Sequence, residues 1–169
     1  MIYSDRCELR IISKNDDFYI RKLYENEQVR KYLGGTVGEE AYKLRFDDML
    51  HSKNRTFHWT VFLRDTKEFI GLVFLDTYHD GINTEIGYQF LPEYWGRGYA
   101  KEVITRVLEH GFSTLNLPRI VAETQTSNTA SCVLLRKMGM TLEEQLERFG
   151  NQKSKFILSN PKVNYVSGE

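Results

Sequence analysis

The chain has 169 residues, of which 41% are hydrophobic, and its 23 basic and 23 acidic residues give a formal net charge of zero. This length and apolar content predict one globular domain over residues 1–169. The balanced charge argues against a nucleic-acid-binding protein and against binding to acidic membranes. No apolar run is long enough to span a bilayer and the N-terminus lacks the apolar stretch of a secretory signal, so we expect a cytoplasmic protein. Two cysteines and four scattered histidines give no metal-ligand spacing, so no metal is expected.

The first third of the chain predicts one strand followed by short helices. In chain order we expect a strand over residues 8–12, a helix capped by Asp16 or Asp17, a helical turn that ends at Gly34–Gly35, and a helix opened by a capping box of Thr36 and Glu39. The apolar side of the last helix is expected to carry Leu44, Met49 and Leu50.

The rest of the chain predicts strands around one long helix. We expect a hairpin of residues 58–63 and 69–78, a strand over 84–91, a helix from Gly98, a strand over 119–124, a short helix from Asn128 to Gly139, and closing strands at 142–146 and 156–158. The strands on either side of the long helix should run parallel, joined by a crossover. The polar tail from Asn160 is expected to be loose. This order indicates a mixed α/β domain.

A glycine-rich turn, Trp95-Gly96-Arg97-Gly98-Tyr99-Ala100, joins the strand over 84–91 to the long helix. A helix that starts on glycines leaves its first backbone N–H groups open, and together with the helix dipole they can bind a phosphate. The dinucleotide fingerprint fails because Lys101 stands where its third glycine should be, and no G-K-[ST] completes a Walker P-loop. On the glycines alone, a tight turn without a ligand is the alternative.

The same turn, with its flanking segments, resembles the GNAT N-acetyltransferase family. Gly98 and Ala100 match the small residues of the acyl-CoA pattern Q/R-x-x-G-x-G/A, whereas Trp95 replaces its first residue, a substitution similar to the RimJ/RimL-like branch that acetylates ribosomal-protein N-termini. Leu9-Arg10, Glu85-Ile86-Gly87-Tyr88 and the segment from Asn128 to Met140 also resemble that branch. The resemblance implies an α/β (α+β) fold in which helices flank a mixed, mostly antiparallel sheet of about seven strands and a splayed parallel strand pair holds acyl-CoA.

The resemblance also implies which residues bind acetyl-CoA as co-substrate. The main chain of Tyr88, Gln89 and Phe90 would pair with the pantetheine amides like an added strand. The side chain of Asn128 would reach the pantetheine, although it can equally serve as a plain helix N-cap. For Arg97 and Lys101, solvated surface charge is the alternative to phosphate contact. The residues expected to hold the pyrophosphate are Gly96, Arg97, Gly98, Tyr99, Ala100 and Lys101.

Acetyl transfer to an amine needs a base, because an ammonium must lose a proton before its nitrogen can attack. Glu85 is the first candidate and Glu123 the second. Either glutamate could instead pair with a surface cation, or Glu85 could only attract the substrate ammonium. Many family members place a tyrosine near the leaving sulfur, but this chain has Leu135 at that position. Ser131 is the remaining candidate for contact with the sulfur, and a small residue that merely avoids a clash is the alternative.

The sequence therefore predicts an acetyl-CoA-dependent N-acetyltransferase that acts by direct transfer in a ternary complex. The acceptor would be a primary amine, either a protein N-terminus or a small molecule. A catalytically weak CoA-binding or regulatory module of the same fold is the alternative, and the resemblance leaves a homodimer open.

Overall fold

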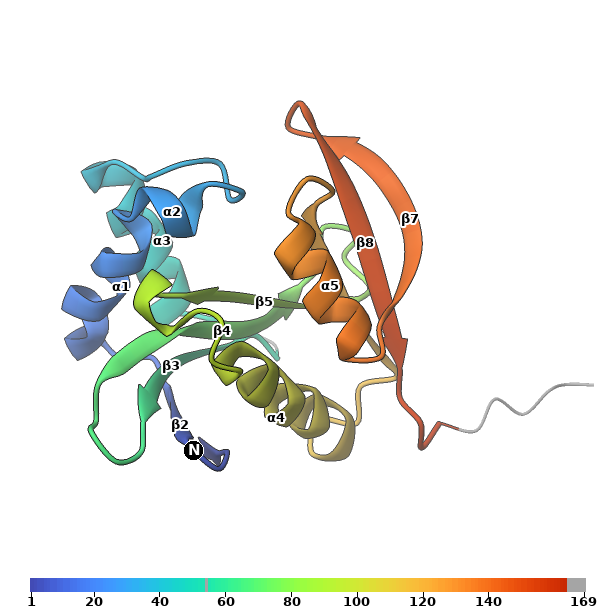
Figure 1. Cartoon of the computed structure of the whole chain (residues 1–169), viewed down its shortest axis with the longest axis horizontal. Helices are drawn as coiled ribbons and strands as arrows, with labels where there is room; N and C mark the ends of the chain where they lie inside the picture. Colours follow the sequence, from blue (N-terminus) through green and yellow to red (C-terminus); the bar gives the residue numbers. More distant parts are fainter. Residues whose placement is uncertain (54, 164–169) are drawn as a thin grey trace, which may run out of the picture.

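The computed structural model describes residues 1–53 and 55–163, and in them one eight-stranded mixed sheet carries helices on both faces (Figure 1). The sheet order is β1-β2-β3-β4-β5-β6-β8-β7, and β5–β6 is the parallel pair among antiparallel neighbours. About seven strands were expected, and the additional one is the two-residue β1. The strands are β1 (Ile2–Tyr3), β2 (Cys7–Ile11), β3 (Phe57–Leu63), β4 (Phe69–Thr77), β5 (Thr84–Phe90), β6 (Arg119–Gln125), β7 (Thr141–Arg148) and β8 (Asn151–Ser159).

Each face of the sheet has its own hydrophobic core. One core packs α4 and α5 against the sheet, and the other packs α1, α2 and α3 against the opposite face. None of the helices in the described ranges is long and apolar enough to cross a membrane. The helices are α1 (Asp17–Tyr24), α2 (Glu27–Arg30), α3 (Glu39–Leu50), α4 (Tyr99–Ser113) and α5 (Thr129–Lys137), with 3₁₀ turns η1 (Lys14–Asp16) and η2 (Pro92–Tyr94).

The start of α3 differs from the prediction. Its N-cap is Gly38 and no side chain caps it, so the capping box of Thr36 and Glu39 is wrong. The carboxylate of Glu39 instead accepts hydrogen bonds from the guanidinium of Arg21 on α1. Leu44 is 71% exposed, because the buried face of α3 is formed by Tyr42, Phe46 and Met49.

The expected loose tail is also corrected at its first residue. Asn160 is only 5% exposed, and its Nδ2 donates to the carbonyl oxygens of Phe112 (3.2 Å) and Leu117 (2.9 Å). Its backbone N–H donates to the carbonyl of Pro118. A polar residue is therefore buried because it satisfies carbonyls at the end of α4. Residues 164–169 of the predicted tail lie outside the described residues.

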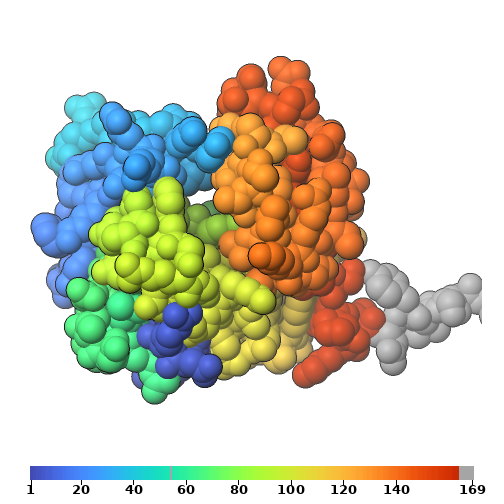
Figure 2. All heavy atoms as spheres, viewed as in Figure 1, coloured from blue at the N-terminus to red at the C-terminus, as the bar shows by residue number. Residues whose placement is uncertain are grey.

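The parallel strands part soon after they meet, as the splayed pair requires. β5 pairs with β4 along its whole length, from Thr84 to Phe90, but with β6 only at Thr84 and Glu85. From Ile86 onward, one edge of β5 is therefore not covered by β6. Figure 2 shows the gap above this part of the sheet, between the blue segments of the α1–α3 layer and the orange α5. The predicted crossover and parallel pair are confirmed.

Candidate active site

The glycine turn presents open backbone amides at the start of α4. Gly96 and Gly98 have φ of +72° and +82°, a left-handed conformation that only glycine adopts without strain. The first helical hydrogen bond runs from the N–H of Glu102 to the carbonyl of Gly98. The helix itself therefore does not use the amides of Tyr99, Ala100 and Lys101. Such amides, with the positive end of the helix dipole, form a binding site for an anion.

The side chain of Trp95 connects this turn to the end of β5. Its indole Nε1 donates a 2.7 Å hydrogen bond to the carbonyl of Phe90, the last residue of β5. A tryptophan in place of the family's Gln or Arg thus ties the turn to the strand before it. The carbonyl of Phe90, one of the main-chain groups expected to face pantetheine, already accepts this bond. The side chains of Arg97 and Lys101 are exposed beside the turn.

Residues at the start of the chain also hold the turn, a contact that was not predicted from the sequence. The carboxylate of Glu102, in the first turn of α4, accepts hydrogen bonds from Ser4 Oγ (2.5 Å), Arg6 N (2.7 Å) and Arg6 Nε (2.8 Å). The guanidinium of Arg6 lies over the ring of Tyr99, 4.1 Å from its centroid. A Cβ added to Gly98 would lie 3.4 Å from Arg6 Nη2. Residues 96 positions apart are thereby fixed together.

The two candidate glutamates lie on one face of the sheet. Glu85 is opposite Val121 in the parallel pair, and Glu123 is two residues further along β6. Asp76 of β4 is the other cross-strand neighbour of Glu85. Burial raises the pKa of Glu85 to about 7, and the charges of Glu123 and Asp76 act in the same direction. A carboxyl group with this pKa can both lose and accept a proton near neutral pH.

Glu123 is held much more tightly than Glu85. Its side chain is 5% exposed, and Oε2 lies 3.3 Å from Arg148 Nη1 and 3.2 Å from His79 Nε2. Burial, followed by a hydrogen bond to Glu123, raises the pKa of Tyr78. Glu123 is therefore enclosed by partners from β7 and from the loop between β4 and β5, whereas no hydrogen bond or ion pair within the described residues holds the side chain of Glu85.

Asn128, Ser131 and Tyr88 meet on the other side of the splay. Asn128 caps α5, since its Oδ1 accepts a 3.2 Å hydrogen bond from the N–H of Ser131. The hydroxyl of Ser131 lies 2.7 Å from the hydroxyl of Tyr88 on β5. Leu135, where the resemblance leads one to look for a tyrosine, is 1% exposed in the core. The sequence predicted a role only for the main chain of Tyr88, so the contact of its hydroxyl with Ser131 was not predicted.

Gly87 and Gln89 face the α1–α3 side of the sheet. A Cβ on Gly87 would lie 2.0 Å from Cζ of Phe74, so a larger residue here requires the Phe74 ring to move. Gln89 is 6% exposed, and its Oε1 finds no hydrogen-bond partner in residues 1–53 and 55–163. The predicted contact of Gln89 with pantetheine concerns its main chain, on the edge of β5 that β6 leaves uncovered.

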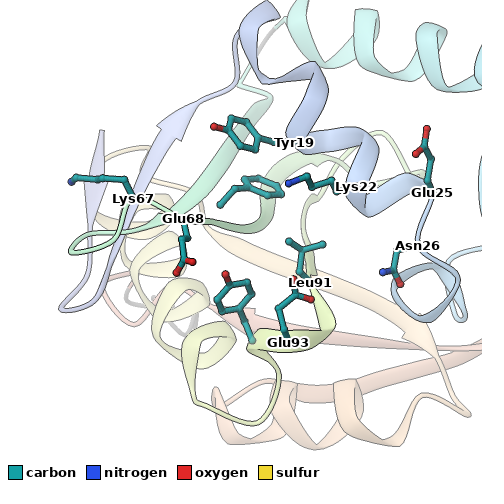
Figure 3. Close-up of a pocket in the computed structure, with 10 residues that line it drawn as sticks. Tyr19, Lys22, Glu25, Asn26, Lys67, Glu68, Leu91 and Glu93 are labelled. Carbon is teal, nitrogen blue, oxygen red and sulfur yellow. The ribbon is translucent and has the colours of Figure 1, made fainter.

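Two open cavities lie near the sheet, and neither is at the glycine turn. The cavity in Figure 3, of about 570 Å³, contains none of the predicted site residues. A second one, of about 500 Å³, reaches Asp76, the cross-strand neighbour of Glu85 on β4. We place the candidate site at the splay, because Glu85 and Tyr88 lie on β5, Ser131 contacts Tyr88, and the open amides follow the end of this strand. Within the described part of the chain, no group of three or more His, Cys, Asp or Glu residues is arranged to hold a metal. The cavity in Figure 3 is lined by Tyr19, Lys22, Glu25, Asn26, Lys67, Glu68, Phe69, Leu91, Glu93 and Tyr94.

Comparison with known proteins agrees with this geometry. The family model described as an acetyltransferase (GNAT) domain matches residues 6–141. The uncharacterized N-acetyltransferase YoaA of Bacillus subtilis is 35% identical over 154 residues, which cover 88% of this chain and 87% of that protein. The spermidine N(1)-acetyltransferase of Vibrio cholerae is 26% identical over 174 residues, with 95% and 98% covered. The crystal structure of a GNAT-family acetyltransferase from Bacillus anthracis superposes with a TM-score of 0.82 at 24% identity, covering 94% of this chain and 98% of that one. The chain belongs to the GNAT acetyltransferase family.

Proposed function

We propose that residues 1–169 form one N-acetyltransferase domain that transfers an acetyl group from acetyl-CoA directly to a primary amine in a ternary complex. One observation carries the proposal: a single strand, β5, has a carboxyl group of pKa about 7 near its start and open helix amides just beyond its end. An acyl donor bound at the amides and an amine near the carboxyl group would meet along this strand.

The residues at the splay fit an acyl-CoA. The amides of residues 96–101 suit the pyrophosphate, and the exposed side chains of Arg97 and Lys101 can add charge to the same phosphates. The edge of β5 that β6 leaves uncovered, at Tyr88, Gln89 and Phe90, suits the amides of pantetheine. When bound, acetyl-CoA supplies the activated acetyl group. Asn128 spends its Oδ1 on the helix cap, so its NH₂ group is the part available to a ligand.

Glu85 is proposed as the general base. Near pH 7 about half of its carboxyl groups are ionised, and an ionised Glu85 can take a proton from the acceptor ammonium. Glu123 is proposed to support this role rather than to share it, because its negative charge helps to raise the pKa of Glu85 while its own oxygen faces Arg148 and His79. A general base needs a carboxylate oxygen that is free to accept a proton, and the side chain of Glu85 has no partner within the described residues that would occupy it.

The acceptor is proposed to be a cationic amine. Asp76, Glu85 and Glu123 lie on one face of neighbouring strands and attract positive charge. The relative named spermidine N(1)-acetyltransferase supports a small polyamine. The likeness of the Trp95 turn to the RimJ/RimL-like branch supports a protein N-terminus instead. An amine panel with spermidine, monoamines and short peptides, read out as free thiol released from acetyl-CoA, tests both.

Binding and turnover separate this proposal from a CoA-binding module without catalysis. Acetyl-CoA at 100 times its dissociation constant should stabilise the protein by about 2.7 kcal/mol, which a thermal shift detects. If acetyl-CoA gives no shift, the proposed function is wrong. If the shift appears but no amine in the panel gives turnover between pH 7 and 9, the non-catalytic module is the better account.

A further inference from the structure

The hydroxyl groups of Tyr88 and Ser131 form a bridge across the splay. They lie 2.7 Å apart, on β5 and α5, just after β5 and β6 separate. Each of the two residues is held from its own side. Asn128 caps the N–H of Ser131, and the ring of Tyr88 packs against the core of the α4 and α5 face. The bridge therefore has a defined position next to the uncovered edge of β5.

The bridge supplies the hydroxyl group that Leu135, the position where the resemblance leads one to look for a tyrosine, does not have. Leu135 lies one helical turn after Ser131 and is buried in the core, so it has no polar group to offer. Ser131 is partly exposed at the start of α5, and its hydroxyl can donate only one hydrogen. If Tyr88 donates to Ser131 Oγ, the hydrogen of Ser131 is directed away from Tyr88.

We propose that Tyr88 orients the Ser131 hydroxyl so that Ser131 donates its hydrogen bond to the sulfur of CoA as the C–S bond breaks. Ser131 is then the catalytic residue, and Tyr88 is a positioning residue that acts through it. This inference rests on the proposed function and adds to it how the leaving group is stabilised.

The bridge donates a hydrogen bond and not a proton. The pKa of an ordinary thiol is about 8.5 and that of a tyrosine is about 10. Burial raises the pKa of Tyr88 further, so its hydroxyl stays protonated and is the weaker acid of the two. Proton transfer from Tyr88 to the sulfur would therefore run uphill. In the balanced reaction the N–C bond forms, the C–S bond breaks and the sulfur leaves as a hydrogen-bonded thiolate. Glu85 takes the first proton from the acceptor ammonium before attack, and the second proton that the nitrogen loses as the amide forms passes to solvent.

The first test measures the pKa of the thiol of bound CoA from its ultraviolet thiolate absorbance. The wild-type protein should lower this pKa below that of free CoA, and Tyr88→Phe and Ser131→Ala should each raise it again. Tyr94→Phe is the matched control, because it removes a hydroxyl from a half-buried tyrosine outside the bridge. An identical bound-thiol pKa in wild type and Tyr88→Phe overturns the inference. Since this readout needs no acceptor, it remains decisive even if no amine gives turnover and the proposed function fails.

The second test separates positioning from folding. Ser131→Ala should lower kcat by about 10²-fold, as loss of a donor to a developing negative charge does, and Tyr88→Phe by about 10-fold. KM for acetyl-CoA and the melting temperature should stay close to wild type. The double variant should be no slower than Ser131→Ala, because both residues act through one hydrogen bond. Additive losses in the double variant, or a fall in melting temperature that accounts for the loss of rate, would show that Tyr88 is only structural.

Discussion

Replacing Glu85 with glutamine should slow the enzyme and stabilise the fold. Its pKa is raised from 4.5 to about 7, which corresponds to about 3 kcal/mol against the ionised form in the folded protein. Below pH 4.5 both states hold the proton and there is no penalty. Between pH 4.5 and 7 the folded state binds more protons than the unfolded state, so stability falls as pH rises. Above pH 7 the full penalty applies.

Glutamine carries no charge and avoids this penalty. Urea unfolding should therefore show Glu85→Gln to be more stable than wild type by up to about 3 kcal/mol at pH 8, with the difference vanishing near pH 4. Over the same range, kcat/KM of wild type should rise with pH and level off above 7. The variant should lose this rise and fall by about 10²- to 10⁴-fold at pH 8.

Glu147→Gln is the matched control, since Glu147 is exposed on β7. It should reproduce wild type in both measurements. If Glu85→Gln keeps the wild-type pH profile of kcat/KM, Glu85 is not the base. An equal free energy of unfolding for the variant and wild type at pH 4 and pH 8 refutes the perturbed carboxyl group itself.

Three further variants test other parts of the structure. Glu123→Gln removes a charge that raises the pKa of Glu85, so the rise in kcat/KM should move to lower pH; a shift to higher pH contradicts this account. Gly87→Ala should destabilise the fold by about 1–3 kcal/mol in urea, because its Cβ would overlap the half-buried ring of Phe74, whereas Gly38→Ala, with open space and negative φ, should not. Although burial opposes it, hydrogen bonds from the N-terminal segment lower the pKa of Glu102. The stability that Glu102→Gln loses should therefore be measurable at neutral pH and disappear as wild type is titrated below pH 4.5, through the folded pKa; a loss that persists in acid contradicts it.

Local patterns in the sequence predicted most helices and strands well, and they marked the turn whose backbone amides the structure leaves open. The glycines at 96 and 98 marked the turn, because positive φ is a local requirement that only glycine meets without strain. Asn128 marked the start of α5 in the same way, because an N-cap bonds to an amide three residues on. The Thr36 and Glu39 capping box failed since Arg21, 18 residues away, binds the carboxylate that the box needed.

Contacts between distant segments could not be read from the sequence. The bridge of Tyr88 to Ser131 spans 43 positions, and the bond of Arg6 to Glu102 spans 96. Each contact depends on strand register and helix packing, which local patterns in the sequence do not reveal. The raised pKa of Glu85 is of the same kind, because it comes from burial and from charges on two neighbouring strands. The sequence ranked Glu85 before Glu123 as a candidate, but it could not predict that the pKa of Glu85 is raised while Glu123 is paired with Arg148 and His79.

The short parallel join between β5 and β6 has a mechanical consequence. On β5, only Thr84 and Glu85 pair with β6. The sheet therefore consists of two antiparallel blocks, β1–β5 and β6–β8, joined at two residue pairs, which we call the seam. A small rotation about this seam would open or close the gap between the blocks without breaking either ladder. Glu85 sits in the seam, where such a rotation moves it least. Glu85, the proposed base, would keep its place while the two blocks move relative to each other.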